Sequence, residues 1–218
     1  MVLRTPVPPP PELLSRSTLA HYERVAEAFW QGTRDHDVEQ NIQALLRALG
    51  PGSFRILDLG CGPGRDLLRF RELGHEAIGL DGALAFVEMA RAHSGCEVWH
   101  QDFIGLALPE AFFDGIFANA SLFHTPRREL PRVLRQLRQS LRAEGALFCV
   151  NPRGPDIESF AEGERYCGYY DLDTWSRLLR EADFEVIEHF YRPEGKARDE
   201  QPWLAMVSRA KPPSAPSS

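Results

Sequence analysis

An excess of basic residues, a signal peptide and a long apolar stretch are all missing from this sequence of 218 residues. Lys and Arg number 25 against 31 Asp and Glu, which gives a formal net charge of -6. Because nucleic-acid binders neutralise phosphates with a basic surface, we expect no nucleic acid as a dedicated partner. No apolar run reaches the length of a membrane span, so we expect a cytoplasmic protein without a membrane partner.

Cysteine is also sparse, and no C-x-x-C pair occurs among the four cysteines, Cys61, Cys96, Cys149 and Cys167. We therefore expect free thiols, with neither a disulfide nor a structural metal. Asp35-His36-Asp37 places two carboxylates beside an imidazole. Adjacent loop residues rarely chelate one ion, so a solvated loop or a helix cap is the favoured interpretation and no metal is expected.

Hydrophobic residues make up 43% of the chain and charged residues 26%, as in ordinary globular proteins. The length fits a single α/β domain, which we place at residues 17–210. Within it, residues 17–50 are expected to form a helical lid and residues 51–210 the core. The proline-rich residues 1–16 and the polar residues 211–218 bury little, so we expect a flexible leader and a flexible tail.

From residue 54 onward, strand-like and helical stretches alternate, which is typical of βαβ crossovers and a mainly parallel sheet. Apolar spacing before them predicts one helix over residues 17–30 and a second that ends at Leu49. Strands are predicted over residues 54–59, 75–80, 97–100, 114–118, 145–150, 184–191 and 203–207, and helices over 66–73, 83–92, 130–141 and 174–182. The last two strands lack an intervening helix, which predicts an antiparallel hairpin at one edge.

The strongest local signal is Ile56-Leu57-Asp58-Leu59-Gly60-Cys61-Gly62-Pro63-Gly64, an apolar strand that runs into a glycine-rich turn. Such glycines let the backbone turn tightly and approach a ligand at a helix N-terminus. Asp58 can hold an ammonium group, but it would sit badly beside a pyrophosphate. The Gly-x-Gly-x-Gly spacing also lacks the third glycine of a dinucleotide site. The alternative is a tight βα turn with a packing aspartate.

Two further carboxylates follow the second and third predicted strands. Asp81 ends the second strand, where it can accept hydrogen bonds from both ribose hydroxyls of a nucleoside, although a helix N-cap is the alternative. Asp102 can accept a hydrogen bond from an adenine amino group, and Phe103 can pack on the ring. The alternative for Asp102 is an ordinary turn residue.

Asn119, Ser121 and His124 follow the fourth predicted strand, at the end of the sheet where open α/β folds bind ligands. His124 is our candidate general base, or a residue that orients the nucleophile, because histidine titrates near neutral pH. The alternative is that His124 only lines the pocket or caps the following helix.

Together and in this order, these four segments resemble the class I S-adenosylmethionine-dependent methyltransferases, over about residues 18–208. The resemblance implies a three-layer Rossmann-like fold: a seven-stranded, mainly parallel sheet with an antiparallel C-terminal edge hairpin and an N-terminal helical lid. It also implies S-adenosylmethionine as cofactor, S-adenosylhomocysteine as product, and a small-molecule acceptor. The implied cofactor contacts are Asp58, Gly60, Cys61, Gly62, Gly64, Asp81, Gly82, Asp102, Phe103 and Asn119.

Aromatic and basic residues outside these motifs are candidates for the lid and the acceptor pocket. Tyr22, Trp30, Tyr169 and Tyr170 can stabilise a sulfonium, and core packing is the alternative for each of them. Arg34 can hold the cofactor carboxylate or a substrate acid once the lid closes. Tyr169 and Tyr170 precede the last helix, where loops of similar enzymes shape the acceptor pocket. We expect a monomer or a homodimer.

Three other functions stay open. A cyclase or lyase that releases methylthioadenosine, such as an azetidine-2-carboxylate synthase, would need the same pocket. An NAD(P)-dependent oxidoreductase is disfavoured by Asp58 and by the glycine spacing. A non-catalytic nucleoside-binding module is disfavoured by the intact acidic residues and the aromatic lid.

Overall fold

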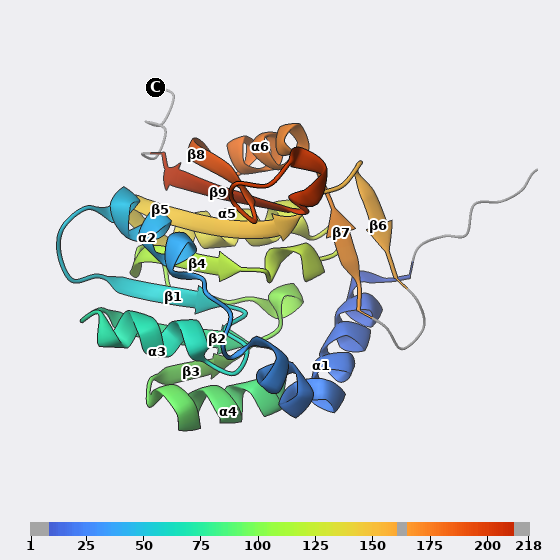
Figure 1. The fold of residues 1–218 in the computed structure, drawn as a ribbon, viewed down its shortest axis with the longest axis horizontal. Helices are drawn as coiled ribbons and strands as arrows, with labels where there is room; N and C mark the ends of the chain where they lie inside the picture. Colours follow the sequence, from blue (N-terminus) through green and yellow to red (C-terminus); the bar gives the residue numbers. More distant parts are fainter. Residues whose placement is uncertain (1–8, 161–164, 212–218) are drawn as a thin grey trace, which may run out of the picture.

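A seven-stranded sheet forms the centre of the computed structural model, which describes residues 9–160 and 165–211 (Figure 1). In spatial order its strands are β3 (Glu97–His100), β2 (Glu76–Asp81), β1 (Arg55–Leu59), β4 (Phe113–Asn119), β5 (Leu141–Pro152), β9 (Trp203–Ala210) and β8 (Phe184–Arg192). The first five are mutually parallel, whereas β9 runs antiparallel to both β5 and β8. The predicted Rossmann-like sheet and its antiparallel edge hairpin are confirmed.

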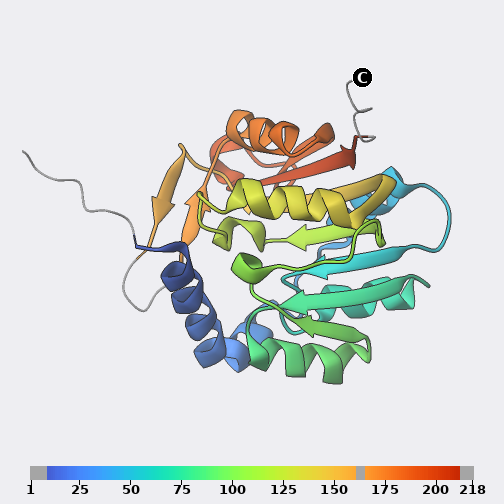
Figure 2. The ribbon, with the colours of Figure 1, turned by 180° about the vertical axis from the view of Figure 1, so that it is seen from behind.

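Helices cover both faces of the sheet: α2 (Glu39–Leu49), α3 (Arg65–Glu72) and α4 (Leu84–Ser94) on one, α5 (Leu130–Ser140) and α6 (Leu172–Glu181) on the other. Figure 2 shows α5 and α6 in front of the strands. Successive side chains of a strand point to opposite faces of the sheet, so each strand contributes to the apolar layers on both faces. Ile56 belongs to the apolar cluster under α2 and α3, and Leu57 to the cluster under α5.

Helix α1 (Pro11–Thr33) lies at the end of the sheet toward which the arrows of β1 and β4 point (Figure 1). It begins six residues before the predicted start, so the predicted leader is wrong for Pro11–Arg16. Proline suits this start, because its missing N–H and its fixed φ fit the first helical turn. Residues 1–8 and 212–218 of the expected leader and tail lie outside the described residues.

Of the two helices assigned to the lid, only α1 covers the strand ends. Helix α2 instead packs on β4, β5 and β9, with Ile42, Ala44 and Leu45 fully buried. Helix α1 is anchored elsewhere, because the Glu23 carboxylate accepts hydrogen bonds from the backbone N–H groups of Leu84 and Ala85 at the start of α4. Of the residues 17–50 predicted as a lid, only those in α1 therefore lie over the strand ends.

A second, two-stranded sheet was not predicted: β6 (Ile157–Ser159) pairs with β7 (Cys167–Tyr169). Strands of three residues carry too little periodicity to be found in a sequence. Strand β5 also begins four residues earlier than predicted, and Glu144, at φ +62°, lies in the irregular stretch of its pairing with β4. No helix within the described ranges combines the length and apolar character that crossing a bilayer requires.

Candidate active site

A cavity of about 560 Å³ lies at the carboxyl ends of β1, β2 and β4, with α1 along one side. This volume is in the range of sites for small ligands and cofactors. Most of the residues predicted from sequence line it, namely Tyr22, Trp30, Gly60, Cys61, Gly62, Asp81, Gly82, Asp102, Phe103, Asn119, Ser121 and His124. Parallel strands place their carboxyl ends at one edge, which is why segments far apart in sequence meet here.

The three glycines of the turn after β1 have different tasks. A Cβ on Gly60, at φ +71°, would lie 2.4 Å from the Ser121 Cβ, so this glycine allows β1 and β4 to pack closely. A Cβ on Gly64 would lie 2.8 Å from the Ala90 Cα, so Gly64 is needed for packing of α3 on α4 and does not line the cavity. Gly62, at φ +52°, lines the cavity, and a Cβ there would meet only the Phe29 ring, at 3.8 Å.

Asp58 is also absent from the cavity wall. Its side chain is buried near the first turn of α3, where the Leu67 backbone N–H acts to lower its pKa. Burial and the nearby Asp66 carboxylate raise the pKa of Asp58 well above its usual range. The packing interpretation of Asp58 therefore fits this geometry, and direct contact with a cofactor ammonium does not.

Asp81 holds the glycine turn in place from the end of β2. Its Oδ2 accepts a hydrogen bond from the Gly62 N–H at 2.9 Å, and its Oδ1 accepts one from the Ala83 N–H at 2.9 Å. Burial raises the pKa of Asp81 to about 6, and these backbone donors act in the opposite direction. A carboxylate oxygen can accept more than one hydrogen bond, so ribose hydroxyls can add to the same group.

Asp102 connects the part of the cavity beyond β3 to α1. Its Oδ1 accepts hydrogen bonds from the Ser15 hydroxyl at 2.7 Å and from the Ile104 N–H at 3.0 Å. The second bond caps the short 3₁₀ helix Phe103–Gly105, so the turn role foreseen as the alternative is present. Asp102 and Phe103 nevertheless line the cavity, and Ser15 was missed by sequence reasoning.

A hydrogen-bonded chain of polar side chains runs along the cavity wall from β4 to α2 and α3. The Asn119 amide donates to Asp66 Oδ2 at 2.8 Å, and the Asn41 amide donates to Asn119 Oδ1 at 3.0 Å. Arg65 donates to both oxygens of Asp66, at 2.6 and 3.0 Å. Sequence reasoning assigned no role to Asn41, Arg65 or Asp66, although the last two directly follow the glycine turn.

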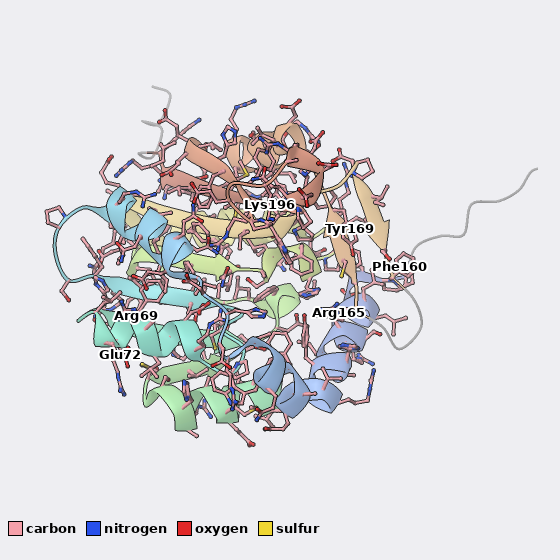
Figure 3. All side chains as sticks on the ribbon, viewed as in Figure 1. Arg69, Glu72, Phe160, Arg165, Tyr169 and Lys196 are labelled. Atoms are coloured by element: carbon pink, nitrogen blue, oxygen red, sulfur yellow. The ribbon has the colours of Figure 1, made fainter. Side chains whose placement is uncertain are left out.

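His124 is held between the lid and the segment before β7. Its Nδ1 lies 2.7 Å from the Tyr166 carbonyl oxygen, and its Nε2 lies 2.7 Å from the Tyr22 hydroxyl. A carbonyl can only accept, so Nδ1 carries the hydrogen and Nε2 carries the lone pair that accepts from Tyr22. Arg165, labelled beside α1 in Figure 3, donates from Nη1 to the same Tyr22 hydroxyl at 3.1 Å.

Burial governs the protonation of this group. It lowers the pKa of His124 to about 4, although the Tyr166 carbonyl opposes that effect, so the imidazole is neutral near pH 7. Burial raises the pKa of Tyr22, while the Arg165 guanidinium acts to lower it. Neither Arg165 nor Tyr166 carries a sequence motif, and only the folded chain reveals that Tyr166 contacts His124 and that Arg165 contacts Tyr22.

Aromatic rings form the inner surface of the lid. The Tyr22 ring packs edge-on against Phe29 at 5.6 Å between centroids, and both rings contact Phe86 on α4, at 5.4 and 5.2 Å. Trp30 also lines the cavity and lies 4.8 Å from the His93 ring. Core packing and cavity lining therefore coincide for Tyr22, and the Arg165 guanidinium already lies over its ring, 5.7 Å from the centroid.

Three other predicted residues lie outside the cavity. Arg34 is exposed and pairs with Asp35 at 3.4 Å, so its proposed contact with a ligand carboxylate is wrong for this structure. Tyr170 is fully buried, 5.7 Å from the Trp175 ring, because it faces the core beneath α6. Tyr169 lies on β7, where Figure 3 labels it, and is not among the residues that line the cavity.

Comparison with known proteins agrees with this geometry. Residues 56–145 match the model of the family described as "Methyltransferase domain". A malonyl-[acyl-carrier protein] O-methyltransferase of Xylella fastidiosa (strain M23) is 30% identical over 170 residues, which cover 72% of this chain and 56% of the relative. A tRNA U34 carboxymethyltransferase of Idiomarina loihiensis (strain ATCC BAA-735 / DSM 15497 / L2-TR) is 30% identical over 155 residues, 62% and 47% of the two chains. The chain thus spans about half the length of these curated relatives.

Among solved structures, a 1,6-didemethyltoxoflavin-N1-methyltransferase of Burkholderia thailandensis has a TM-score of 0.79 and 20% identity. The alignment covers 96% of this chain and 94% of that one, whose structure contains 1,6-didemethyltoxoflavin and S-adenosylhomocysteine. The fold is therefore that of the Rossmann-like methyltransferases. Residues 56–145, which carry the glycine turn and the acidic strand ends, match the methyltransferase-domain model, in agreement with the resemblance that the motifs indicated.

Proposed function

We propose that this protein transfers a methyl group from S-adenosylmethionine to a small-molecule acceptor. The observation that carries the proposal is the one cavity in which Gly62, Asp81 and Asp102 lie at the ends of β1, β2 and β3, and His124 lies beyond the end of β4. A nucleoside fits the first group, because Gly62 leaves space where a Cβ would stand and Asp81 offers carboxylate oxygens. An acceptor fits beside His124.

S-adenosylmethionine, when bound, supplies a methyl group on a sulfonium that is a good leaving group. The protein's part is then to align the nucleophile with this methyl group and to exclude water. Helix α1 serves both purposes, because Ser15 attaches it to Asp102 and Tyr22 attaches it to His124. The Tyr22 ring supplies an aromatic face on the same helix.

Tyr22 and His124 can together remove a proton from the acceptor. The Tyr22 oxygen would take the proton from the acceptor O–H or N–H, while its own hydrogen passes to His124 Nε2 over 2.7 Å. Arg165 stabilises negative charge that develops on the Tyr22 oxygen, because it already donates to that atom. His124 is the terminal proton acceptor of this relay, and its pKa of about 4 makes it a weaker base than the near-neutral histidine expected from the sequence. The Tyr166 carbonyl fixes its tautomer.

The experiment that tests the function measures binding before turnover. Calorimetry should detect the binding of S-adenosylmethionine and of S-adenosylhomocysteine. It should detect no tight binding of a nicotinamide dinucleotide. Turnover with a panel of small acceptors should then release S-adenosylhomocysteine, identified by mass. Methylthioadenosine as the product would indicate the cyclase or lyase alternative, and tight binding of the dinucleotide alone would overturn the proposal.

The acceptor class is argued from the site and not from relatives, whose printed names include an acyl-carrier-protein enzyme and a tRNA enzyme. A cavity of about 560 Å³ lined by α1 suits a compact molecule better than a duplex. The net charge of -6 also opposes a phosphate backbone. A gel-shift titration with total tRNA checks this, and saturable binding below micromolar concentration would contradict it.

A matched pair of variants tests the proton path. Tyr22→Phe keeps the ring and its packing but removes the hydroxyl, and His124→Ala removes the base. Both should lower kcat by roughly 10²-fold or more, in the range of general-base effects, while affinity for S-adenosylhomocysteine changes little. An unchanged kcat for His124→Ala with the true acceptor would leave His124 with a lining role only.

A further inference from the structure

Arg192, the last residue of β8, is a cation of the cavity wall whose hydrogen-bond acceptors are all neutral. Its Nη1 donates to the Asn41 side-chain oxygen at 2.7 Å, and its Nη2 donates to the Asp37 backbone carbonyl at 3.4 Å. No carboxylate within residues 9–160 and 165–211 forms an ion pair with it. Because a guanidinium stays charged in proteins, a positive charge borders the cavity without an ion-pair partner among these residues.

Arg65 provides the contrast on the same cavity wall. Asp66 accepts two hydrogen bonds from its guanidinium, at 2.6 and 3.0 Å, and the Thr33 carbonyl accepts a third. Its charge is therefore neutralised inside the protein, whereas that of Arg192 is not. A guanidinium carries five N–H donors, and the protein occupies two of those on Arg192. The remaining donors suit a planar group with two oxygens.

The position of Arg192 in the sheet indicates which ligand it faces. Asp81 and Asp102 follow β2 and β3 at one edge of the sheet, whereas Arg192 ends β8 at the opposite edge. Its partner in register is Trp203, the first residue of β9, which lines the cavity together with Val150 of β5. A nucleoside on Asp81 would thus leave the Arg192 end, with its indole and apolar surface, to the second substrate.

We propose that the methyl acceptor is a carboxylic acid whose carboxylate binds Arg192 and whose apolar body lies against Trp203 and Val150. This inference rests on the proposed function, since it assigns the second substrate of that site. A singly charged group fits better than a phosphate, because the other arginine of the cavity wall is already paired with Asp66. Arg192 takes the role that the sequence suggested for Arg34.

The test compares acids with their amides on three forms of the full chain: wild type, Arg192→Gln and Arg34→Gln. The probes are a panel of planar aromatic carboxylic acids, each paired with its carboxamide, with and without S-adenosylhomocysteine. Ligand-observed NMR ranks the pairs and calorimetry measures S-adenosylhomocysteine alone. Arg34→Gln is the matched control, because it removes an arginine near α2 that does not line the cavity.

For wild type and Arg34→Gln, we expect at least one acid to bind about tenfold or more tightly than its amide, as a charge-assisted pair should. Arg192→Gln should abolish this preference and leave the affinity for S-adenosylhomocysteine within about twofold. Arg192→Lys retains the positive charge but not the paired N–H donors of the guanidinium, so it should keep part of the preference for acids over amides. It replaces Arg192→Gln if that variant fails to fold.

Two results would overturn the inference. One is that no acid of the panel binds wild type better than its amide. The other is that Arg192→Gln weakens S-adenosylhomocysteine tenfold while any acid preference persists, which would assign Arg192 to the amino-acid carboxylate of the cofactor. Neither result touches the proposed function. The proposed function fails separately, when wild type does not bind S-adenosylhomocysteine. In that case the comparison of acids and amides without S-adenosylhomocysteine still tests whether Arg192 binds a carboxylate.

Discussion

Replacing Asp81 by Asn should change how the stability of the protein depends on pH. Asp81 is 8% exposed, and burial raises its pKa from an ordinary value of 3.8 to about 6. Between these two values the unfolded chain has lost the proton and the folded chain still holds it, so stability falls as pH rises. The pKa difference corresponds to a loss of about 3 kcal/mol in the free energy of unfolding. This loss is complete above about pH 6 and absent below about pH 4.

The assay is urea unfolding of wild type and Asp81→Asn at a series of pH values. The Asn side chain has one acceptor oxygen, so the N–H of Gly62 or Ala83 loses its partner, but this loss of about 1–3 kcal/mol does not vary with pH. From pH 4.5 to 7.5, wild type should therefore lose about 2 kcal/mol relative to the variant. The neighbouring Glu23 carboxylate is present in both proteins and largely cancels.

Parallel pH profiles of the two proteins would refute the reasoning, because they would mean that Asp81 titrates alike in both states. Ligand binding provides a second readout with the opposite sign. Ribose hydroxyls donate to the ionised carboxylate, so wild type should bind S-adenosylhomocysteine with constant affinity above about pH 6.5 and progressively more weakly below pH 6. Asp81→Asn should bind weakly at every pH in this range.

Three further substitutions separate packing from ligand contact. Gly60→Ala should lower the free energy of unfolding by roughly 2 kcal/mol or more, because its Cβ would lie 2.4 Å from Ser121 at φ +71°; urea melts without a shift would contradict this. Gly62→Ala should cost about 1 kcal/mol for its φ of +52°, yet weaken S-adenosylhomocysteine at least tenfold, since its methyl group enters the cavity; calorimetry with unchanged affinity would exclude that placement. Ser15→Ala should remove about 1 kcal/mol from the attachment of α1 to Asp102, seen as faster amide exchange in the first half of α1, and unaltered exchange would show that the bond holds nothing.

The local pattern of the sequence was sufficient for the fold. The run that ends at Gly64 predicted a strand, a turn and a helix, because the spacing of apolar residues and the positions of turn-forming glycines are local properties of the sequence. The β3 strand was placed at its observed bounds, and the edge hairpin of β8 and β9 followed from the missing helix between them. The start of α1 was missed, since the prolines before Glu12 were interpreted as a leader.

Most of the candidate site could be named from sequence for the same reason, because motif residues such as Gly62 and Asp81 are tied to strand ends. The failures have a common cause. Asp58 and Gly64 belong to the motif, but their environments are set by α3 and α4 packing on the sheet, which no local pattern encodes. Whether a motif residue touches the ligand or supports the turn behind it is therefore a tertiary property.

The order of strands, the glycine turn and the acidic residues at strand ends were thus readable along the chain, because each depends on neighbours a few residues away. Only the folded chain joined Tyr22 to His124 and Arg165, and only it brought Arg192 to Asn41, 151 residues apart in sequence. Hydrogen-bond partners over such separations are decided by how helices and strand ends pack together, and the protonation of His124 follows from that burial.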